Sequence, residues 1–303
     1  MRVDLHQHFW TEPLLDALAA RKCFPFVDRP DGLTVLHSAE ERPYVIDVTA
    51  DSERRRTERL SDVGADLAVV AISSPIGIET LEHEVASELI AAHLDGVFAL
   101  GDRFAVWGPV ALDTPSPSEV DDVLARGCIG VSLPAGALAG PQALEHIYPV
   151  LERVQSRGVP LFVHPGGVSA PGHEASLDEP LWWRALTDYV SQMQAAWLTF
   201  AAYGRRELPR LAVVFAMLAG GAPMLAERLA TRGGPTLDLR DPLTFYDTSS
   251  YGERMVETMA DWVGYQQLVY GSDQPVVQPT PLGRDRELMT NGAELLSRVG
   301  ALS

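Results

Sequence analysis

Near its N-terminus the sequence reads Val3-Asp4-Leu5-His6-Gln7-His8-Phe9-Trp10, and this stretch decides between two folds. Its short apolar start predicts a strand, which ends in a His-x-His motif. In a doubly wound open sheet, the first strand is commonly followed by a glycine-rich turn that binds phosphate. No such turn follows here, so the stretch favours a parallel barrel and leaves the open sheet as the alternative.

Outward from this stretch, short apolar runs alternate with longer amphipathic segments. Runs rich in Val, Ile, Leu and Phe predict strands buried on both faces. These strands are 3–5, 67–72, 105–112, 129–133, 161–163, 211–216, 243–246 and 267–270. Helical spacing of apolar residues predicts helices over 78–94, 118–126, 141–156, 186–203, 223–231, 252–263 and 288–299. This α/β alternation predicts a (β/α)8 TIM barrel in which residues 1–303 form a single domain.

Composition excludes several functional classes. The chain has 303 residues, of which 46% are hydrophobic and 21% charged, as in an ordinary globular protein. Its formal net charge of −17 repels phosphate backbones and anionic lipids, so we expect neither nucleic-acid nor membrane binding. The absence of a long apolar run and of a C-x-x-C pattern leads us to expect a cytoplasmic location.

Polar residues stand at the ends of three predicted strands. His6 and His8 close the first strand, His164 closes the fifth, and Asp273 follows the eighth. Alternate strand residues point the same way, and the carboxyl ends of barrel strands surround one mouth. Three imidazoles and a carboxylate at that mouth suit one divalent cation, with Zn²⁺ expected first and Mn, Fe or Co also acceptable. Taken singly, each residue has an ordinary structural explanation, but their joint placement favours a metal site.

The same segments resemble the amidohydrolase superfamily. Asp4–Trp10 is similar to its opening motif, Gly158–Pro165 to its fifth strand and Tyr270–Pro275 to its eighth. The branch that the chain resembles is the "amidohydrolase 2" group, which includes aminocarboxymuconate semialdehyde decarboxylase and γ-resorcylate decarboxylase. The resemblance implies a distorted barrel, His6, His8, His164 and Asp273 as metal ligands, a small-molecule substrate and a homodimer.

One position departs from that family. Its sixth strand normally ends in a proton-handling His before Gly-Gly, whereas Met217 takes that place here, and the last histidine of the chain is His173. A thioether cannot transfer protons. We therefore expect Asp273 to act as the catalytic base, with His173 and Glu174 as the alternative.

The only lysine bears on the number of metal ions. Two-metal members of the superfamily commonly bridge their ions with a carboxylated lysine after the fourth strand. Here that strand runs into Leu133-Pro134-Ala135, and Lys22 lies near the first strand instead. We therefore expect one metal ion.

Several further residues are candidates for the substrate pocket. Trp10, Trp182, Trp183, Arg184 and Met217 stand in or near segments that follow barrel strands. Aromatic walls and an arginine would suit a partly apolar, anionic substrate. Alternatively, the tryptophans pack loops against the barrel and Arg184 is an ordinary surface residue. The charged stretch 47–58 predicts a solvated helix face.

The leading functional hypothesis is a mononuclear metal-dependent hydrolase that attacks an amide, lactone or similar bond with activated water. A second hypothesis is non-oxidative decarboxylation of an aromatic or enoic acid. A third is a barrel that keeps its metal but serves as a binding or scaffold protein, which the loss of the family's histidine favours modestly.

Overall fold

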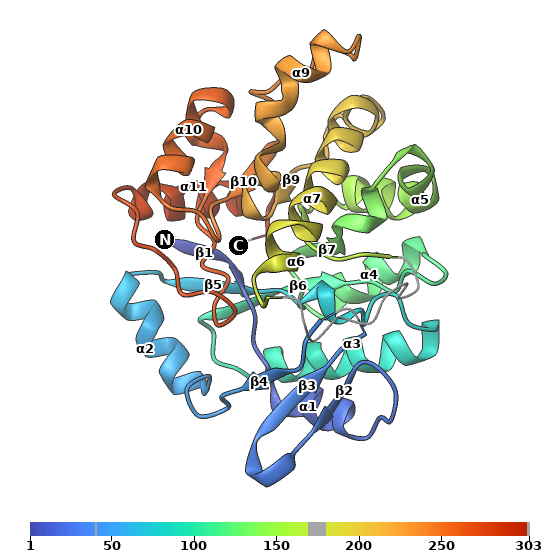
Figure 1. Cartoon of the computed structure of the whole chain (residues 1–303), viewed down its shortest axis with the longest axis vertical. Coiled ribbons are helices and arrows are strands. Elements are labelled where there is room, and N and C mark those ends of the chain that lie inside the picture. The colour runs from blue at the N-terminus through green and yellow to red at the C-terminus, as the bar shows by residue number, and fades with distance from the viewer. Residues whose placement is uncertain (40, 169–179, 302–303) are drawn as a thin grey trace.

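The computed structural model describes residues 1–39, 41–168 and 180–301, and its centre is a parallel barrel (Figure 1). The barrel strands follow the order β1-β5-β6-β7-β8-β9-β10-β11. Their bounds are β1 Val3–Gln7, β5 Leu67–Val70, β6 Phe104–Pro109, β7 Gly130–Pro134, β8 Leu161–His164, β9 Val213–Phe215, β10 Thr244–Asp247 and β11 Leu268–Val269. Each of these strands overlaps a predicted one, so the predicted barrel is confirmed.

Backbone hydrogen bonds close the barrel between β1 and the segment around β11. Leu5 N donates to Tyr270 O over 2.9 Å, and Asp273 N donates to His6 O over 2.8 Å. The contact continues as an isolated bridge between Gln7 and Gln274, beyond the two-residue strand β11. The barrel is distorted at this seam because irregular chain replaces part of a strand.

Helices surround the barrel (Figure 1). They are α1 Glu12–Ala19, α2 Glu53–Val63, α3 His83–Phe98, α4 Pro117–Ala125, α5 Pro141–Arg157, α6 Trp183–Leu186, α7 Asp188–Thr199, α8 Arg205–Glu207, α9 Ala226–Thr231, α10 Glu253–Val263 and α11 Asp285–Arg298. Helix α5 shows why the periodicity was informative, because its stripe of Leu144, Ile147, Val150, Leu151 and Val154 is buried. Across the described residues, no helix combines the length and the apolar character that crossing a membrane requires.

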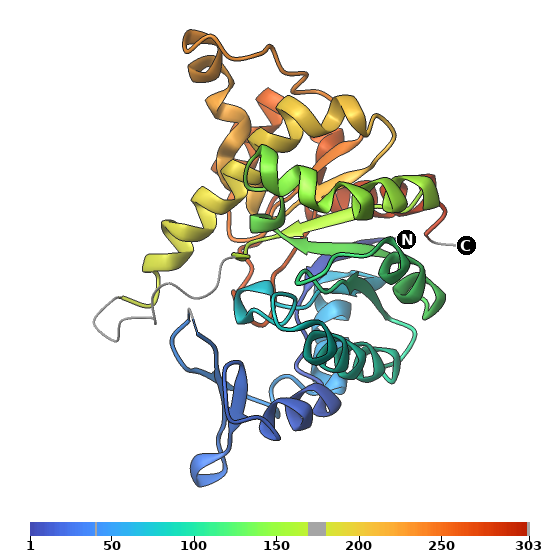
Figure 2. The ribbon, with the colours of Figure 1, turned by 90° about the vertical axis from the view of Figure 1, so that its right-hand side faces the viewer.

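A small antiparallel sheet was not predicted from the sequence. It consists of β2 Phe26–Asp28, β3 Thr34–His37 and β4 Tyr44–Ile46, paired in the order β2-β3-β4. The turn between β2 and β3 is Pro30-Asp31-Gly32, a combination typical of turns between apolar runs. In Figure 2 this sheet and α6 lie on the side of the molecule opposite the two chain ends.

Two predicted helices have different bounds or geometry in the structure. The segment 78–94 becomes helical only at His83, and the segment 223–231 only at Ala226. Before Ala226 lies η5, Met217–Leu225, in which residues 217–221 all have positive φ. A run of this kind reverses the usual handedness, so the apolar periodicity gave no sign of it.

The charged stretch 47–58 is only partly a solvated helix face. Arg54 and Arg55 of α2 reach solvent and pair with Glu58 over 3.1 and 3.2 Å. Arg56, however, is 1% exposed and points into the protein. The expectation of a wholly solvated face was therefore wrong at Arg56.

Candidate metal centre and adjoining pocket

Four side chains from three strand ends meet at the mouth of the barrel. His6 lies in β1 with His8 just beyond it, His164 ends β8, and Asp273 follows β11. One ligand atom from each lies within 4.8 Å of the others, and all four residues are buried. The structure thus brings together the four side chains that the sequence singled out, although they are separated by up to 267 positions along the chain (273 − 6).

The Nδ1 atoms of the three histidines all face oxygen acceptors. His8 Nδ1 lies 2.8 Å from the carbonyl of Ala71, and His164 Nδ1 lies 2.8 Å from that of Pro165. His6 Nδ1 lies 2.8 Å from Oδ2 of Asp247. Since a carbonyl oxygen only accepts, the proton of a neutral imidazole must sit on Nδ1. In its neutral form each ring therefore presents a lone pair on Nε2, as in the hydrogen-bonded histidine ligands of metalloproteins.

These lone pairs point at one another. Nε2 of His6 lies 3.2 Å from Nε2 of His8, and Oδ1 of Asp273 lies 3.2 Å from His8 Nε2 and 3.6 Å from His6 Nε2. Oδ1 of Asp273 is buried and has no hydrogen-bond donor among the described residues. Acceptors packed this closely repel unless a cation lies between them. The donor set fits one divalent metal ion.

Local charges favour a cation at this place. Burial lowers the pKa of His6, but the carboxylates of Asp247 and Asp273 outweigh it and raise that pKa to about 9. Burial and the neighbouring imidazoles of His8 and His6 hold the pKa of His164 well below its usual value, so His164 stays neutral. The carboxylates that attract a proton to His6 attract a metal ion for the same reason.

Asp247 is a functional candidate that the sequence analysis missed. Its Oδ1 accepts hydrogen bonds from Met217 N over 3.0 Å, Ser249 N over 2.9 Å and Ser249 Oγ over 2.5 Å, while Oδ2 holds His6. Burial by itself would raise the pKa of this carboxyl, but the attraction of His6 and the hydrogen bonds outweigh burial. The pKa is therefore lower than usual, and Asp247 stays ionised. Asp247 is the last residue of β10, so a search for polar residues at strand ends, which found the four candidate ligands, could also have found Asp247.

Met217 contacts the site through its backbone N–H. Its N–H donates to Asp247, and its φ of 52° begins a left-handed run that includes Leu218 and Ala219. Such conformations cost roughly 1–2 kcal/mol for each non-glycine residue and persist only where surrounding structure holds them. The side chain is buried, and Met217 does not line the pocket described below. The alternative bases His173 and Glu174 lie outside the described residues.

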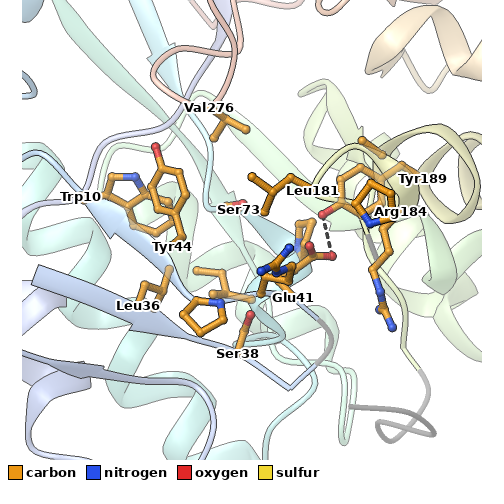
Figure 3. Close-up of a pocket in the computed structure, with 16 residues that line it drawn as sticks. Trp10, Leu36, Ser38, Glu41, Tyr44, Ser73, Leu181, Arg184, Tyr189 and Val276 are labelled. Atoms are coloured by element: carbon orange, nitrogen blue, oxygen red, sulfur yellow. Dashed lines mark hydrogen bonds between the residues drawn. The ribbon is translucent and has the colours of Figure 1, made fainter. Parts of the chain in front are cut away.

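A pocket of about 370 Å³ opens near the candidate metal centre. Figure 3 shows the residues that line it. Trp10 stands two residues after His8, Ser73 two residues after Ala71, and Val276 three residues after Asp273. The pocket and the centre therefore share one end of the barrel. Its remaining walls come from the β2–β4 sheet and the loop that precedes β4, from the short helix η2 Ser74–Ile76 after β5, and from the region of α6 and α7. These walls are Leu36, Ser38, Glu41, Arg42, Pro43, Tyr44, Pro75, Ile76, Pro180, Leu181, Arg184, Ala185 and Tyr189.

Some of the residues predicted to line the substrate pocket do line it, and others do not. Trp10 and Arg184 line the pocket, whereas Trp182 and Trp183 do not and are 56% and 44% exposed. The sequence analysis missed Tyr189, whose hydroxyl donates to Glu41 over 2.8 Å (Figure 3). Burial and the carboxylates of Glu41 and Asp273 raise the pKa of Tyr189 well above its usual value, so it remains a hydrogen-bond donor.

Comparison with known proteins finds solved structures that have a similar fold. Neither the protein-family models nor the curated proteins include a match to the chain. Solved structures do match along its whole length. An IDCase from Metarhizium anisopliae is 18% identical, with a TM-score of 0.69 over 99% of this chain and 94% of its own. A 2,6-dihydroxybenzoate decarboxylase from Rhizobium is 15% identical, with a TM-score of 0.68 over 98% of each chain.

A third structure contains a metal. It is the 5-carboxyvanillate decarboxylase of Novosphingobium aromaticivorans, complexed with manganese and 4-hydroxy-3-methoxy-5-nitrobenzoic acid. That enzyme is 16% identical, with a TM-score of 0.62 over 99% of this chain and 89% of its own. Further matching structures are described as amidohydrolases. The fold of the chain is thus the one that the "amidohydrolase 2" resemblance implied.

Proposed function

We propose that this protein is a metal-dependent decarboxylase that releases CO₂ from a small aromatic or enoic acid without oxidation. The observation that carries the proposal is the convergence of three oriented imidazoles and the Asp273 carboxylate beside a pocket with aromatic walls. The likeness to two named decarboxylases, one of them with manganese, supports decarboxylation over the hydrolysis that we first expected.

The donor set determines which metals are suitable. Three imidazole nitrogens and one carboxylate oxygen accept Zn²⁺ and Mn²⁺ alike. We propose Zn²⁺ first on this chemistry, with Mn²⁺ the alternative that the comparison supports. When bound, a divalent cation withdraws electron density from an oxygen-bearing substrate and so stabilises the negative charge left on carbon.

The residues of the chain have three tasks in this reaction. His6, His8 and His164 hold the centre, while Asp247 fixes the ring of His6. As the C–C bond breaks, its electron pair stays on the substrate carbon and CO₂ leaves, so that carbon must gain one proton. Met217 cannot carry it. We assign delivery of this proton to Oδ1 of Asp273, which is buried, faces the centre and has no hydrogen-bond donor among the described residues.

The pocket has an apolar and a polar part. Trp10 and Tyr44, whose ring centroids are 6.3 Å apart, offer an apolar wall for a planar ring and exclude water from it. Glu41, Tyr189 and Arg184 supply the polar side. We propose that these groups orient the substrate, with the arginine attracting its negative charge.

Hydrolysis remains the second candidate, because one observation favours it. Oδ1 of Asp273, which has no hydrogen-bond donor in the described part of the chain, lies 3.2 Å from His8 Nε2, a position in which it could also accept a proton from water. A binding or scaffold role without turnover is the third candidate.

The decisive experiment uses purified protein loaded with Zn²⁺ or Mn²⁺ and two substrate panels. One panel contains hydroxylated benzoic acids and enoic acids assayed for CO₂ release, and the other contains lactones and amides assayed for hydrolysis. We expect CO₂ release only, and its loss when a chelator removes the metal. Hydrolysis without CO₂ release would overturn the proposal in favour of the second candidate. Metal binding without turnover on either panel would favour the third.

A further inference from the structure

Arg56 is an unusual residue for the middle of a charged helix. The side chains of Arg54 and Arg55 beside it are 73% and 55% exposed, whereas Arg56 is 1% exposed. Burial lowers the pKa of Arg56 to about 10, partly offset by the carboxylate of Asp51, so the guanidinium stays charged at neutral pH. The protein therefore keeps a cation inside, close to a centre that we propose to hold a second cation.

The contacts of Arg56 lead to the metal ligands. Its Nη2 donates to the carbonyl of Gln274 over 3.2 Å, and the same carbonyl accepts the N–H of His8 over 2.7 Å. Its guanidinium carbon lies 5.1 Å from the centre of the Phe9 ring. Gln274 follows Asp273 and Phe9 follows His8 along the chain. Arg56 thus touches the immediate neighbour of a candidate ligand on each side of the barrel seam.

Stability alone does not account for this arrangement. Nε and Nη1 of Arg56 are buried and have no acceptor among the described residues. Leaving buried donors unpaired is destabilising, more so in a charged group, and an apolar side chain of similar size would avoid that cost. A charge retained at such a cost calls for another explanation, and its contact with the seam supplies one.

The seam needs support because of its local conformation. Asp273 has a φ of 55°, which is unfavourable for a non-glycine residue, and β11 ends at Val269, four residues before it. Beyond the end of β11, an isolated bridge between Gln7 and Gln274 is all that continues the strand pairing with β1 among the described residues. Two backbone hydrogen bonds join this segment to β1, from Asp273 N to His6 O and from His8 N to Gln274 O. Arg56, on α2, donates to the same carbonyl of Gln274.

We propose that Arg56 is a positioning residue for the metal centre. By holding the carbonyl of Gln274 against the N–H of His8, it fixes the separation of His8 Nε2 and Asp273 Oδ1, which is 3.2 Å here. The inference rests on the proposed function, since it assigns Arg56 to the proposed metal site. It does not depend on whether the reaction is decarboxylation or hydrolysis.

The test compares Arg56→Met with the parent chain in two measurements. The first is the affinity for Mn²⁺ and Zn²⁺, measured by competition with a chelator, and the second is thermal unfolding of the metal-free protein. We expect metal affinity to fall about 10- to 100-fold, as is usual when a group that orients a ligand is lost. We expect the metal-free variant to unfold at the parent temperature or above, because a buried charge has been removed.

Arg59→Met is the matched control. Arg59 lies on the same helix, and its side chain is 36% exposed and pairs with Asp51 over 3.5 Å. The same chemical change at Arg59 should leave metal affinity unchanged. A folded Arg56→Met variant that binds metal as tightly as the parent would overturn the inference.

Arg56→Lys serves if the methionine variant does not fold. Its ammonium ends one bond short of the position of Nη2, so it cannot keep both the carbonyl and the ring contact. We expect its metal affinity to fall several-fold, and parent affinity would contradict the inference. If the parent chain itself binds no metal, the proposed function fails and the inference falls with it. Parent binding that Arg56→Met leaves unchanged contradicts the inference alone.

Discussion

The candidate metal centre and the β2–β4 wall of the pocket are built in contrasting ways. In the centre, His6, His8 and His164 are buried, and each ring is held by an oxygen acceptor on its far side. In the wall, Leu36 is buried, but Tyr44 is only half-buried and Val45 is 53% exposed. The centre is therefore preorganised, whereas the wall has room to change. Chemistry should be sensitive to small changes in the first region, and substrate choice to changes in the second.

The largest expected effect comes from Asp273→Asn. The amide keeps the shape of the side chain but removes its charge and its ability to carry a proton. We expect turnover to fall by about 1,000-fold or more, since lost proton transfer alone commonly costs 100- to 10,000-fold. Steady-state assays and circular dichroism together measure activity and fold. An active, folded variant would remove Asp273 from the mechanism.

Asp247→Asn tests whether metal binding depends on the residue that orients the His6 ring. Asp247 touches His6 but is not among the four converging ligands. We expect metal affinity to fall about 10- to 100-fold because the ring of His6 loses its anionic acceptor. Asp241→Asn is the control, since Asp241 is paired with Arg205 over 2.7 Å instead. Equal metal affinities in the two variants would show that the contrast is wrong.

His93 extends the contrast, because it is a buried histidine whose ring has no such hydrogen-bond acceptor among the described residues. Neither of its ring nitrogens has a partner in that part of the chain, and burial, with a smaller contribution from the nearby His8 ring, lowers its pKa to about 3. Between that value and the unfolded value near 6.5, the unfolded chain binds more protons than the folded one. The stability contribution of His93 is therefore lost as the pH falls through this window.

The corresponding variant is His93→Leu. Between pH 7 and pH 5, the parent should lose about 2 kcal/mol of unfolding free energy more than the variant does. Urea denaturation at several pH values measures this difference. His146→Leu, on the exposed face of α5, should keep the acid sensitivity of the parent. If the unfolding free energy of His93→Leu fell with pH as steeply as that of the parent, the prediction would be contradicted.

The smallest expected effect lies in the pocket wall. Tyr189→Phe removes the hydrogen bond to Glu41 across the pocket. We expect KM to rise about threefold to tenfold, the worth of one ordinary hydrogen bond, while metal affinity stays unchanged. Tyr203→Phe, at a tyrosine that is 52% exposed, should change neither quantity. A fall in metal affinity in Tyr189→Phe would mean that the wall and the centre are not separable.

The barrel could be predicted because its strands are buried on both faces. Leu67–Val70 and Leu161–His164 are fully buried, and such runs stand out in any sequence. The β2–β4 sheet could not be found in the same way, because its strands are short and partly exposed, as the pattern of Tyr44–Ile46 shows. Only the Pro30-Asp31-Gly32 turn gave a local signal.

Some residues of the site could be predicted from the sequence, and others could not. His6, His8, His164 and Asp273 could be singled out because each stands at or beyond the end of an apolar run. Arg56 could not, since its neighbours along the helix are charged and exposed, and only the position of α2 against the seam turns it inward. Trp182 and Trp183 show the opposite case, because large apolar residues next to a site need not face it.

By itself, the sequence determined the parallel barrel, the end of it that carries polar residues and the chemical types of the four candidate ligands. These properties follow from local periodicity and from the alternation of side chains along a strand. The folded chain was needed to show which oxygen orients each imidazole, that Asp247 holds His6, and that a small sheet and α7 contribute to the pocket walls. Those contacts join residues far apart in the chain, so their geometry exists only once the barrel has closed.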